Sequence, residues 1–319
     1  MTEAINGVLV TLINFLFGPI MLCVYFGVGI MMTIRLRGVQ FRRFGMAFRE
    51  CVGNIGGKDE NGKEVGQIKS FKALATALSS CVGNGNIVGI AAAIAIGGPG
   101  AIFWMWVASL LGMATKFSEI CLAMHYRIQD EAGNFRGGVM YILSRGMKNK
   151  TLGKILGGAF AVFTVMVSFI SCGALQANTI ANSLNGETGI GIPLWVVAIV
   201  VLVLDGLVVC GGLKKIANVT TVLTPVMALI YIGFSLIIII LHANMIPTAI
   251  YYVVKSAFTG DAAVGGVAGA TMAFAIQKGV SRGVFSNEAG IGSSAIVHAT
   301  AIVDKPTRQS LYGIIEVFF

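Results

Sequence analysis

The chain has 319 residues, of which 12% are charged and 56% are hydrophobic, and its mean hydropathy is +0.83. Soluble domains carry about 25% charged residues, so this composition excludes a soluble enzyme, a disordered chain and a small disulfide scaffold. The formal net charge is +9. No motif for binding nucleic acid accompanies it, and in a membrane protein Lys and Arg collect in cytoplasmic loops.

Long stretches without Asp, Glu, Lys or Arg divide the chain. They cover 4–34, 73–115, 155–186 and 216–254. Each exceeds the ~20 apolar residues that cross a bilayer, which predicts a polytopic membrane protein with only α-helical spans. Helices are expected at 7–34, 71–96, 101–126, 155–183, 194–212, 217–242 and 262–281, with a further one starting near 307. The first is expected to be a retained helix, because no basic segment precedes it.

The basic residues are distributed unevenly between the loops that these spans define. Every Lys and Arg except Lys255 is assigned to one side. The positive-inside rule then places those loops in the cytoplasm and the N-terminus outside. Lys116 and Glu119 lie three residues apart near the cytoplasmic end of the third span, and we expect a structural ion pair or a gate there.

The second span is a poor continuous helix. Glycines and asparagines alternate from Gly83 to Asn86 at mid-bilayer depth, where no water satisfies an amide. Gly85 and Gly89 by themselves fit close helix packing. The asparagines favour an unwound segment facing a polar cavity. Its carbonyls can bind a cation and the N–H groups of the following half-helix can bind a carboxylate.

The span at 262–281 is also rich in glycine and crosses in the opposite direction. Two interrupted helices of opposite orientation indicate an inverted-repeat transporter, although small-residue packing explains this second span equally well. Gln176 and Asn178 lie late in the fourth span. Asp205 interrupts the fifth, where proton or cation coupling and pairing with a neighbouring helix are both open.

No enzyme motif is present. HExxH, GxSxG and Walker A are all absent from the sequence, and the three histidines and six cysteines show no metal-ligand spacing. We therefore expect neither an enzyme nor a cofactor.

Three segments in this order resemble the alanine or glycine:cation symporter family. They are Ser70–Gly89, Gly97–Val107 with its GGPGAIFWMWV sequence, and Arg282–Ser294 with RGVFSNEAGIGSS. The resemblance implies a leucine-transporter-like fold of two inverted five-helix repeats with one peripheral N-terminal helix. It also implies sodium-coupled uptake of small neutral amino acids by alternating access, across the plasma (inner) membrane of a prokaryote.

The resemblance also implies roles for individual residues. Substrate would be bound by Gly83, Asn84, Gly85, Gln176, Thr271 and Phe274, and sodium by Cys81, Val82 and Asn86 in a partial site. The stretch containing Asn287 and Glu288 would be a cytoplasmic loop with a gating or capping role. Asp205 stays a candidate for coupling on its position inside an apolar span alone. The partners would be a neutral amino acid, a sodium ion and the lipid bilayer, with no nucleic acid and an unassigned oligomeric state.

Two features depart from the family pattern. Asn84 stands where we expect Thr, which favours a pocket shaped for a cargo other than alanine or glycine, such as glutamine. The chain also stops inside a helix of the second repeat. We expect an extra helix at 1–34, a cytoplasmic loop at 35–70, a complete first repeat at 71–242 and an incomplete second repeat at 243–319. The alternatives are a proton-coupled amino-acid transporter and a truncated fragment that does not transport.

Overall fold

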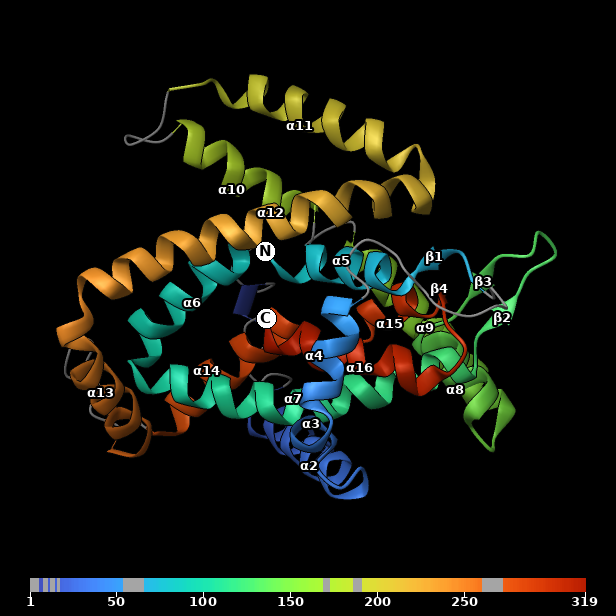
Figure 1. Cartoon of the computed structure of the whole chain (residues 1–319), viewed down its shortest axis with the longest axis horizontal. Coiled ribbons are helices and arrows are strands. Elements are labelled where there is room, and N and C mark those ends of the chain that lie inside the picture. Colours follow the sequence, from blue (N-terminus) through green and yellow to red (C-terminus); the bar gives the residue numbers. More distant parts are fainter. Residues whose placement is uncertain are drawn as a thin grey trace.

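The computed structural model describes residues 6–7, 11, 15, 18–53, 66–168, 173–185, 191–259 and 272–319. Helices dominate this part of the chain (Figure 1). The first half contains α2 (Pro19–Arg35), α3 (Val39–Arg42), α4 (Phe44–Gly53), α5 (Ser70–Cys81), α6 (Asn84–Gly97), α7 (Gly100–His125) and α8 (Val139–Gly146). The second half contains α9 (Lys150–Val167), α10 (Gly173–Asn185), α11 (Leu194–Val209), α12 (Gly212–Leu241), α13 (Ile246–Thr259), α14 (Met272–Asn287), α15 (Ser293–His298) and α16 (Pro306–Phe318).

The strands are very short. β1 (Ile68–Lys69) pairs in parallel with β4 (Ala301–Ile302), which joins the start of α5 to the segment after α15. β2 (Ile128–Gln129) and β3 (Phe135–Arg136) form an antiparallel hairpin after α7. A helical chain of this kind satisfies its backbone hydrogen bonds within each segment, as a bilayer requires.

Several helices are suited to a membrane. Among the described residues, α7, α9 and α12 are long and apolar enough to cross a bilayer, and α5 with α6 would make a further span although the two are bent by 45°. The outer layers carry large apolar side chains on their surface, including Leu202 and Leu204 on α11 and Leu229 and Ile240 on α12. Surface apolar area of this extent is typical of a lipid-facing protein.

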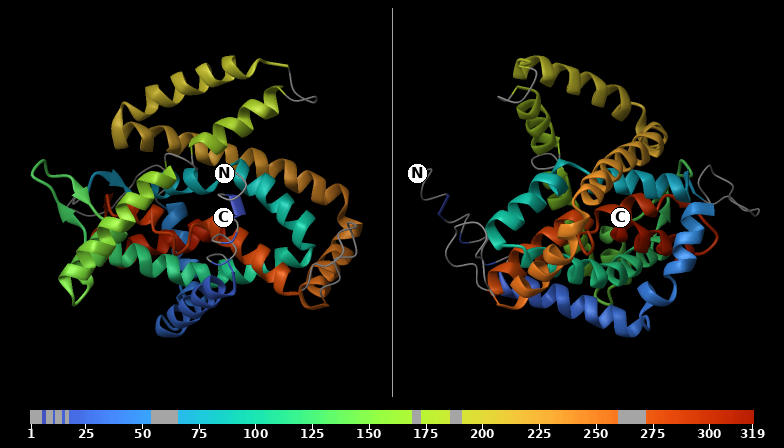
Figure 2. Two further views of the ribbon diagram at one scale, coloured as in Figure 1. Left: turned by 180° about the vertical axis from the view of Figure 1, so that it is seen from behind. Right: turned by 60° about the vertical axis from the view of Figure 1, so that its left-hand side comes forward.

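The helices are stacked in layers. From one side to the other lie the α10–α11 hairpin, α12, the α5–α6 pair, a central layer of α14 and α16, then α7 and finally α2 (Figures 1 and 2). Small residues allow the central layer to approach α7 closely. A Cβ on Gly279 of α14 would lie 2.3 Å from the Ala101 carbonyl oxygen, and a Cβ on Gly313 of α16 would lie 2.5 Å from Ile120 Cδ1.

α16 forms the centre of the core. Every residue from Gln309 to Val317 is buried, because α7, α5 and α4 surround this helix. At its first turn Arg308 forms an ion pair with Glu50 of α4 at 3.1 Å, and the Tyr312 hydroxyl donates to the Glu50 carbonyl. The predicted start near 307 is therefore confirmed.

Besides the helix that starts near 307, four of the predicted spans agree with the structure and three differ from it. Spans 71–96, 101–126, 194–212 and 217–242 correspond to α5–α6, α7, α11 and α12. The predicted helix 155–183 is found as α9 and α10, described separately, with 169–172 outside the described residues. Within 7–34 the helix α2 begins at Pro19, and most earlier residues lie outside the described part. Within 262–281 the described helix α14 begins at Met272 and continues to Asn287.

Five of the described α-helices were not predicted. α3, α4, α8, α13 and α15 lie in segments expected to be loops. α8 and α13 are short amphipathic helices at the ends of long spans, and their polar residues concealed them in a search for apolar runs.

Candidate functional site

The expected interruption of the second span is present. α5 ends at Cys81, Val82 and Gly83 have extended backbone, and α6 begins at Asn84. The Asn86 side chain stabilises this break, because its Nδ2 donates to the Cys81 carbonyl at 2.6 Å. An interruption is thus present but shorter than expected: of the predicted unwound stretch from Gly83 to Asn86, only Gly83 is extended, and Asn84 to Asn86 form the first turn of α6. The side chain of Asn84 lies outside the described part.

Gln176 lies directly against this first break. A Cβ added to Gly83 would be 2.9 Å from Gln176 Nε2 and 3.4 Å from Gln176 Oε1. Gly83 and Gln176 are far apart in the sequence, so spacing along the chain did not predict this contact between α10 and the break. The amide therefore lies beside the free N–H groups that begin α6, where a half-helix attracts negative charge.

A second break follows α14. Between α14 and α15 the residues Glu288, Gly290 and Gly292 have positive φ angles of 53°, 84° and 93°. The sequence analysis placed an interruption in the glycine-rich span at 262–281; from Met272 onward this span is regular helix, and its earlier residues lie outside the described part. A loop containing Asn287 and Glu288 was expected, and the left-handed turn after Asn287 agrees with it, but its role as a second break between two half-helices was not predicted.

The second break lies at the middle of α7. Asn287 Nδ2 donates to Ser109 Oγ at 3.3 Å, and a Cβ on Gly112 would lie 3.1 Å from the Ala289 methyl group. α7 extends from Gly100 to His125, so these contacts fall near its centre. The segment thus packs against the centre of a helix long enough to cross a bilayer, and its expected place on the cytoplasmic side stays a prediction.

The two broken helices run in opposite directions side by side. α14 packs on α6 and α15 packs on α5. At one end a Cβ on Gly97 would lie 3.1 Å from Lys278 Cβ, and further in a Cβ on Gly89 would lie 3.2 Å from Arg282 Nη1. Lys278 and Arg282 thus belong to the half of the molecule opposite to Ser70. The sequence analysis had assigned them to the same side as the basic residues near Ser70, and the side of the membrane on which they lie stays a prediction.

A cavity of about 340 Å³ opens between the breaks. Its polar wall contains Cys81 and Asn86 of the first break, Ser109 of α7, and Ser286 and Asn287 of α14. Its apolar wall is formed by Leu78, Val82, Ile90, Ile102, Met105, Trp106, Val317, Phe318 and Phe319, and Glu316 completes the lining. The predicted sodium-site residues Cys81, Val82 and Asn86 and the predicted gating residue Asn287 therefore share one cavity.

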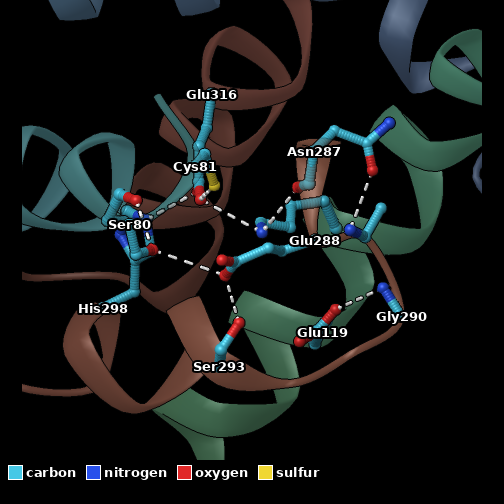
Figure 3. A network of polar contacts seen from close by, with 12 residues as sticks. Ser80, Cys81, Glu119, Asn287, Glu288, Gly290, Ser293, His298 and Glu316 are labelled. Carbon is cyan, nitrogen blue, oxygen red and sulfur yellow. Dashed lines mark hydrogen bonds and ion pairs between the residues drawn. The ribbon is translucent and has the colours of Figure 1, made fainter. Parts of the chain in front are cut away.

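A buried ionic cluster lies beside this cavity (Figure 3). Lys116 of α7 is completely buried and its Nζ lies 3.0 Å from Glu316 Oε1. The other oxygen of Glu316 lies 3.1 Å from His298 Nε2, and His298 Nδ1 is 2.8 Å from the Gln309 amide nitrogen. Glu316 is therefore held between the Lys116 ammonium group and the His298 imidazole, and the other ring nitrogen of His298 is bound to the Gln309 amide.

Lys116 does not pair with Glu119 as the sequence suggested. It binds Glu316, and Glu119 Oε2 accepts a hydrogen bond from the Gly290 N–H at 3.0 Å. Spacing along one helix could not reveal these partners, because they come from α16 and the second break. His298 and Glu316 were not selected as site residues, since each is a single polar residue in an otherwise ordinary segment.

Glu288 connects both breaks. Its Oε2 accepts hydrogen bonds from Ser293 Oγ of α15 and from Ser80 Oγ of α5, the latter at 3.4 Å (Figure 3). The carboxylate thus joins α5 and α15, the two half-helices next to the β1–β4 pair. This position is suited to holding those half-helices together.

The remaining candidates do not lie at this cavity or fall outside the description. Asp205 is exposed on α11 and does not line the cavity. Thr271 lies outside the described residues, as does the side chain of Phe274. Among the residues that the structure describes, no cluster of three His, Cys, Asp or Glu side chains could hold a metal ion.

The family model and the similar proteins point to the same family. The model of the sodium:alanine symporter family matches residues 2–319. An uncharacterised transporter of Haemophilus influenzae is 43% identical over 315 residues, which are 98% of this chain and 66% of that protein. The sodium/alanine symporter AgcS of Methanococcus maripaludis is 40% identical over 308 residues, 97% of this chain and 66% of its own length.

A further relative carries a different substrate in its name. The probable sodium/glutamine symporter GlnT of Bacillus subtilis is 34% identical over 305 residues, 96% of this chain and 60% of GlnT. The chain thus spans slightly less than two thirds of these relatives. The family consists of sodium-coupled amino-acid transporters and not of enzymes, in agreement with the absence of enzyme motifs. On the match across residues 2–319, the chain belongs to the sodium:alanine symporter family.

Proposed function

We propose that the chain forms the substrate- and sodium-binding part of a symporter for small neutral amino acids. The observation that carries the proposal is the position of Gln176 against Gly83, beside a cavity lined by Asn86. A zwitterionic amino acid needs N–H donors for its carboxylate and an acceptor for its ammonium group. The start of α6 and the Gln176 amide oxygen supply these two functions within one small region.

Sodium binds at the end of α5 in this proposal. The last carbonyls of a half-helix carry partial negative charge, and Cys81 and Val82 contribute their oxygens at the first break. At present the Cys81 carbonyl accepts from the Asn86 amide. An Asn side chain can turn its oxygen toward a cation, so exchange of this neutral contact for an ion costs little. Sodium would then order the segment that binds substrate, and substrate would raise sodium affinity equally.

The antiparallel breaks support an inverted-repeat, leucine-transporter-like architecture with alternating access. α5 and α6 belong to the first repeat in this proposal, and α14 and α15 to the second. Asn287 and Glu288 act in gating at the second break. α14 sets Phe274 about 20 Å from Asn287 along its axis at 1.5 Å per residue, so the role of Phe274 and Thr271 in the side-chain pocket stays a prediction.

The cargo follows from the family and its relatives. We infer alanine and glycine as cargo, with glutamine as the alternative that Asn84 and the likeness to GlnT favour. The proposed location is the plasma membrane of a prokaryote, with several spans and the N-terminus outside. Asp205 remains the candidate for proton coupling.

Uptake of labelled alanine tests this function. The full reading frame that contains this chain is placed in proteoliposomes with an inward sodium gradient, and choline replaces sodium in the control. Accumulation that requires sodium and is reduced by unlabelled glycine or glutamine is the expected result. Equal uptake in both salts would contradict sodium coupling and direct attention to Asp205, while absence of uptake by folded protein would contradict the assigned cargo.

A further inference from the structure

The carbonyls of the two breaks have different partners. At the first break the Cys81 carbonyl accepts from a neutral amide, Asn86 Nδ2. At the second break the Asn287 carbonyl accepts from an ammonium group, Lys116 Nζ, at 3.1 Å. Both carbonyls terminate half-helices near the middle of the fold, where negative partial charge is concentrated and where transporters of this architecture bind cations.

The surroundings of Lys116 require a positive charge. Glu316 lies 3.0 Å from its Nζ, and the carboxylates of Glu119 and Glu288 belong to the same cluster. The Lys116 ammonium group thus contacts one carboxylate, Glu316, and one helix-terminal carbonyl, that of Asn287, and it is completely buried. Without it, the second break would hold excess negative charge in a water-poor region.

We propose that the Lys116 ammonium is a built-in cation at the second break, holding by a covalent tether the position that a bound ion would otherwise fill. Lys116 is therefore a positioning residue. It binds the end of α14 to α16, and it leaves the first break as the site that must recruit a sodium ion from solution. This assignment to the first break rests on the proposed function, whereas the role of Lys116 itself can be measured without transport.

The test compares two substitutions of Lys116 that leave different amounts of space at the second break. Lys116→Ala removes the charge and opens room for an ion and water. Lys116→Met removes the same charge but fills that room. The melting temperature of each purified variant in detergent is measured in sodium chloride and in choline chloride at equal ionic strength.

We expect Lys116→Ala to melt well below the wild type in choline and to recover in sodium, with a sodium-dependent shift about twice that of the wild type because two sites then bind the ion. Lys116→Met should melt low in both salts. The double variant Lys116→Ala with Glu316→Gln, which removes both charges, should show only the wild-type sodium shift.

Other outcomes overturn the proposal. Equal loss of stability by Lys116→Ala in sodium and choline would show an ordinary structural ion pair. Recovery on acidification without a sodium response would show that a proton, not a metal ion, replaces the ammonium group. If Lys116→Ala fails to fold even in high sodium while the double variant folds, sodium cannot replace the ammonium group. A wild type without any sodium shift would instead count against the proposed function, and the Lys116→Ala response would still decide the role of Lys116.

Discussion

Gln176 Nε2 lies 2.9 Å from the point where Gly83 would carry a Cβ, so the two residues fit together only because Gly83 has no side chain. This contact brings α10 against the first break. In the proposed function it aligns the amide that binds the substrate ammonium with the N–H groups that bind the carboxylate.

Gly83→Ala should therefore weaken substrate binding. The added methyl group forces Gln176 to move by several tenths of an ångström, and we expect a loss of roughly ten-fold in alanine affinity, equivalent to about 1.4 kcal/mol. Substrate-induced thermal shift or uptake competition measures it. Gly206→Ala on α11 is the matched control, since a Cβ there meets nothing within 4 Å. Unchanged affinity in Gly83→Ala would remove Gln176 from the binding site.

Glu288 provides a test of the second break that is independent of transport. Its φ of 53° is left-handed, which costs a residue with a side chain about 1 kcal/mol more than glycine. Glu288→Ala and Glu288→Gly both remove the carboxylate that accepts from Ser80 and Ser293. We expect Glu288→Gly to be the more stable of the two variants by about 1 kcal/mol in chemical unfolding. If Glu288→Ala is the more stable one, residue 288 continues the helix and the break lies elsewhere.

The sequence predicted the first break and missed the second for a physical reason. Asn84 and Asn86 are polar residues inside an apolar run, and they reveal an interruption without knowledge of any neighbour. Glu288 ends a helix that contains Lys278 and Arg282, so no apolar run surrounds it. Its place at mid-depth follows from packing on α7, which pattern alone does not contain.

The ionic cluster was hidden for a related reason. Lys116 and Glu316 are 3.0 Å apart but belong to α7 and α16, separated by most of the chain. Local spacing favoured Glu119, the nearest acid on the same helix. The partner of a buried charge is decided by which helices pack together, and no rule of sequence spacing covers that choice.

Cys51 reports on the segment between α2 and α5, outside the membrane spans. Burial raises the pKa of its thiol from 9.0 to about 11, so the thiol stays protonated in the folded chain when it would ionise in the unfolded one. Between pH 9 and 11 the unfolded state loses this proton first, and the folded state becomes less stable as the pH rises. Cys51→Ala should flatten the fall in melting temperature over this range, whereas Cys210→Ala, at an exposed position, should leave it unchanged. A fall that is identical in both variants would assign it to other groups.

Asn86 and Gln176 separate the two ligands of the proposed symporter. Asn86 contacts the end of α5 through the Cys81 carbonyl, whereas Gln176 lies at the start of α6, so their removal should affect different titrations. We expect Asn86→Ala to raise the sodium concentration needed for half-maximal uptake by roughly ten-fold, because a hydrogen bond or ion contact of about 1.4 kcal/mol is lost. Gln176→Ala should raise the half-saturating alanine concentration by a similar factor at saturating sodium. Linkage adds a smaller change in the other ligand for each variant. Wild-type titrations for both ligands in both variants would place the binding site away from the first break, and an equal effect on both ligands would show that sodium and substrate share one set of contacts.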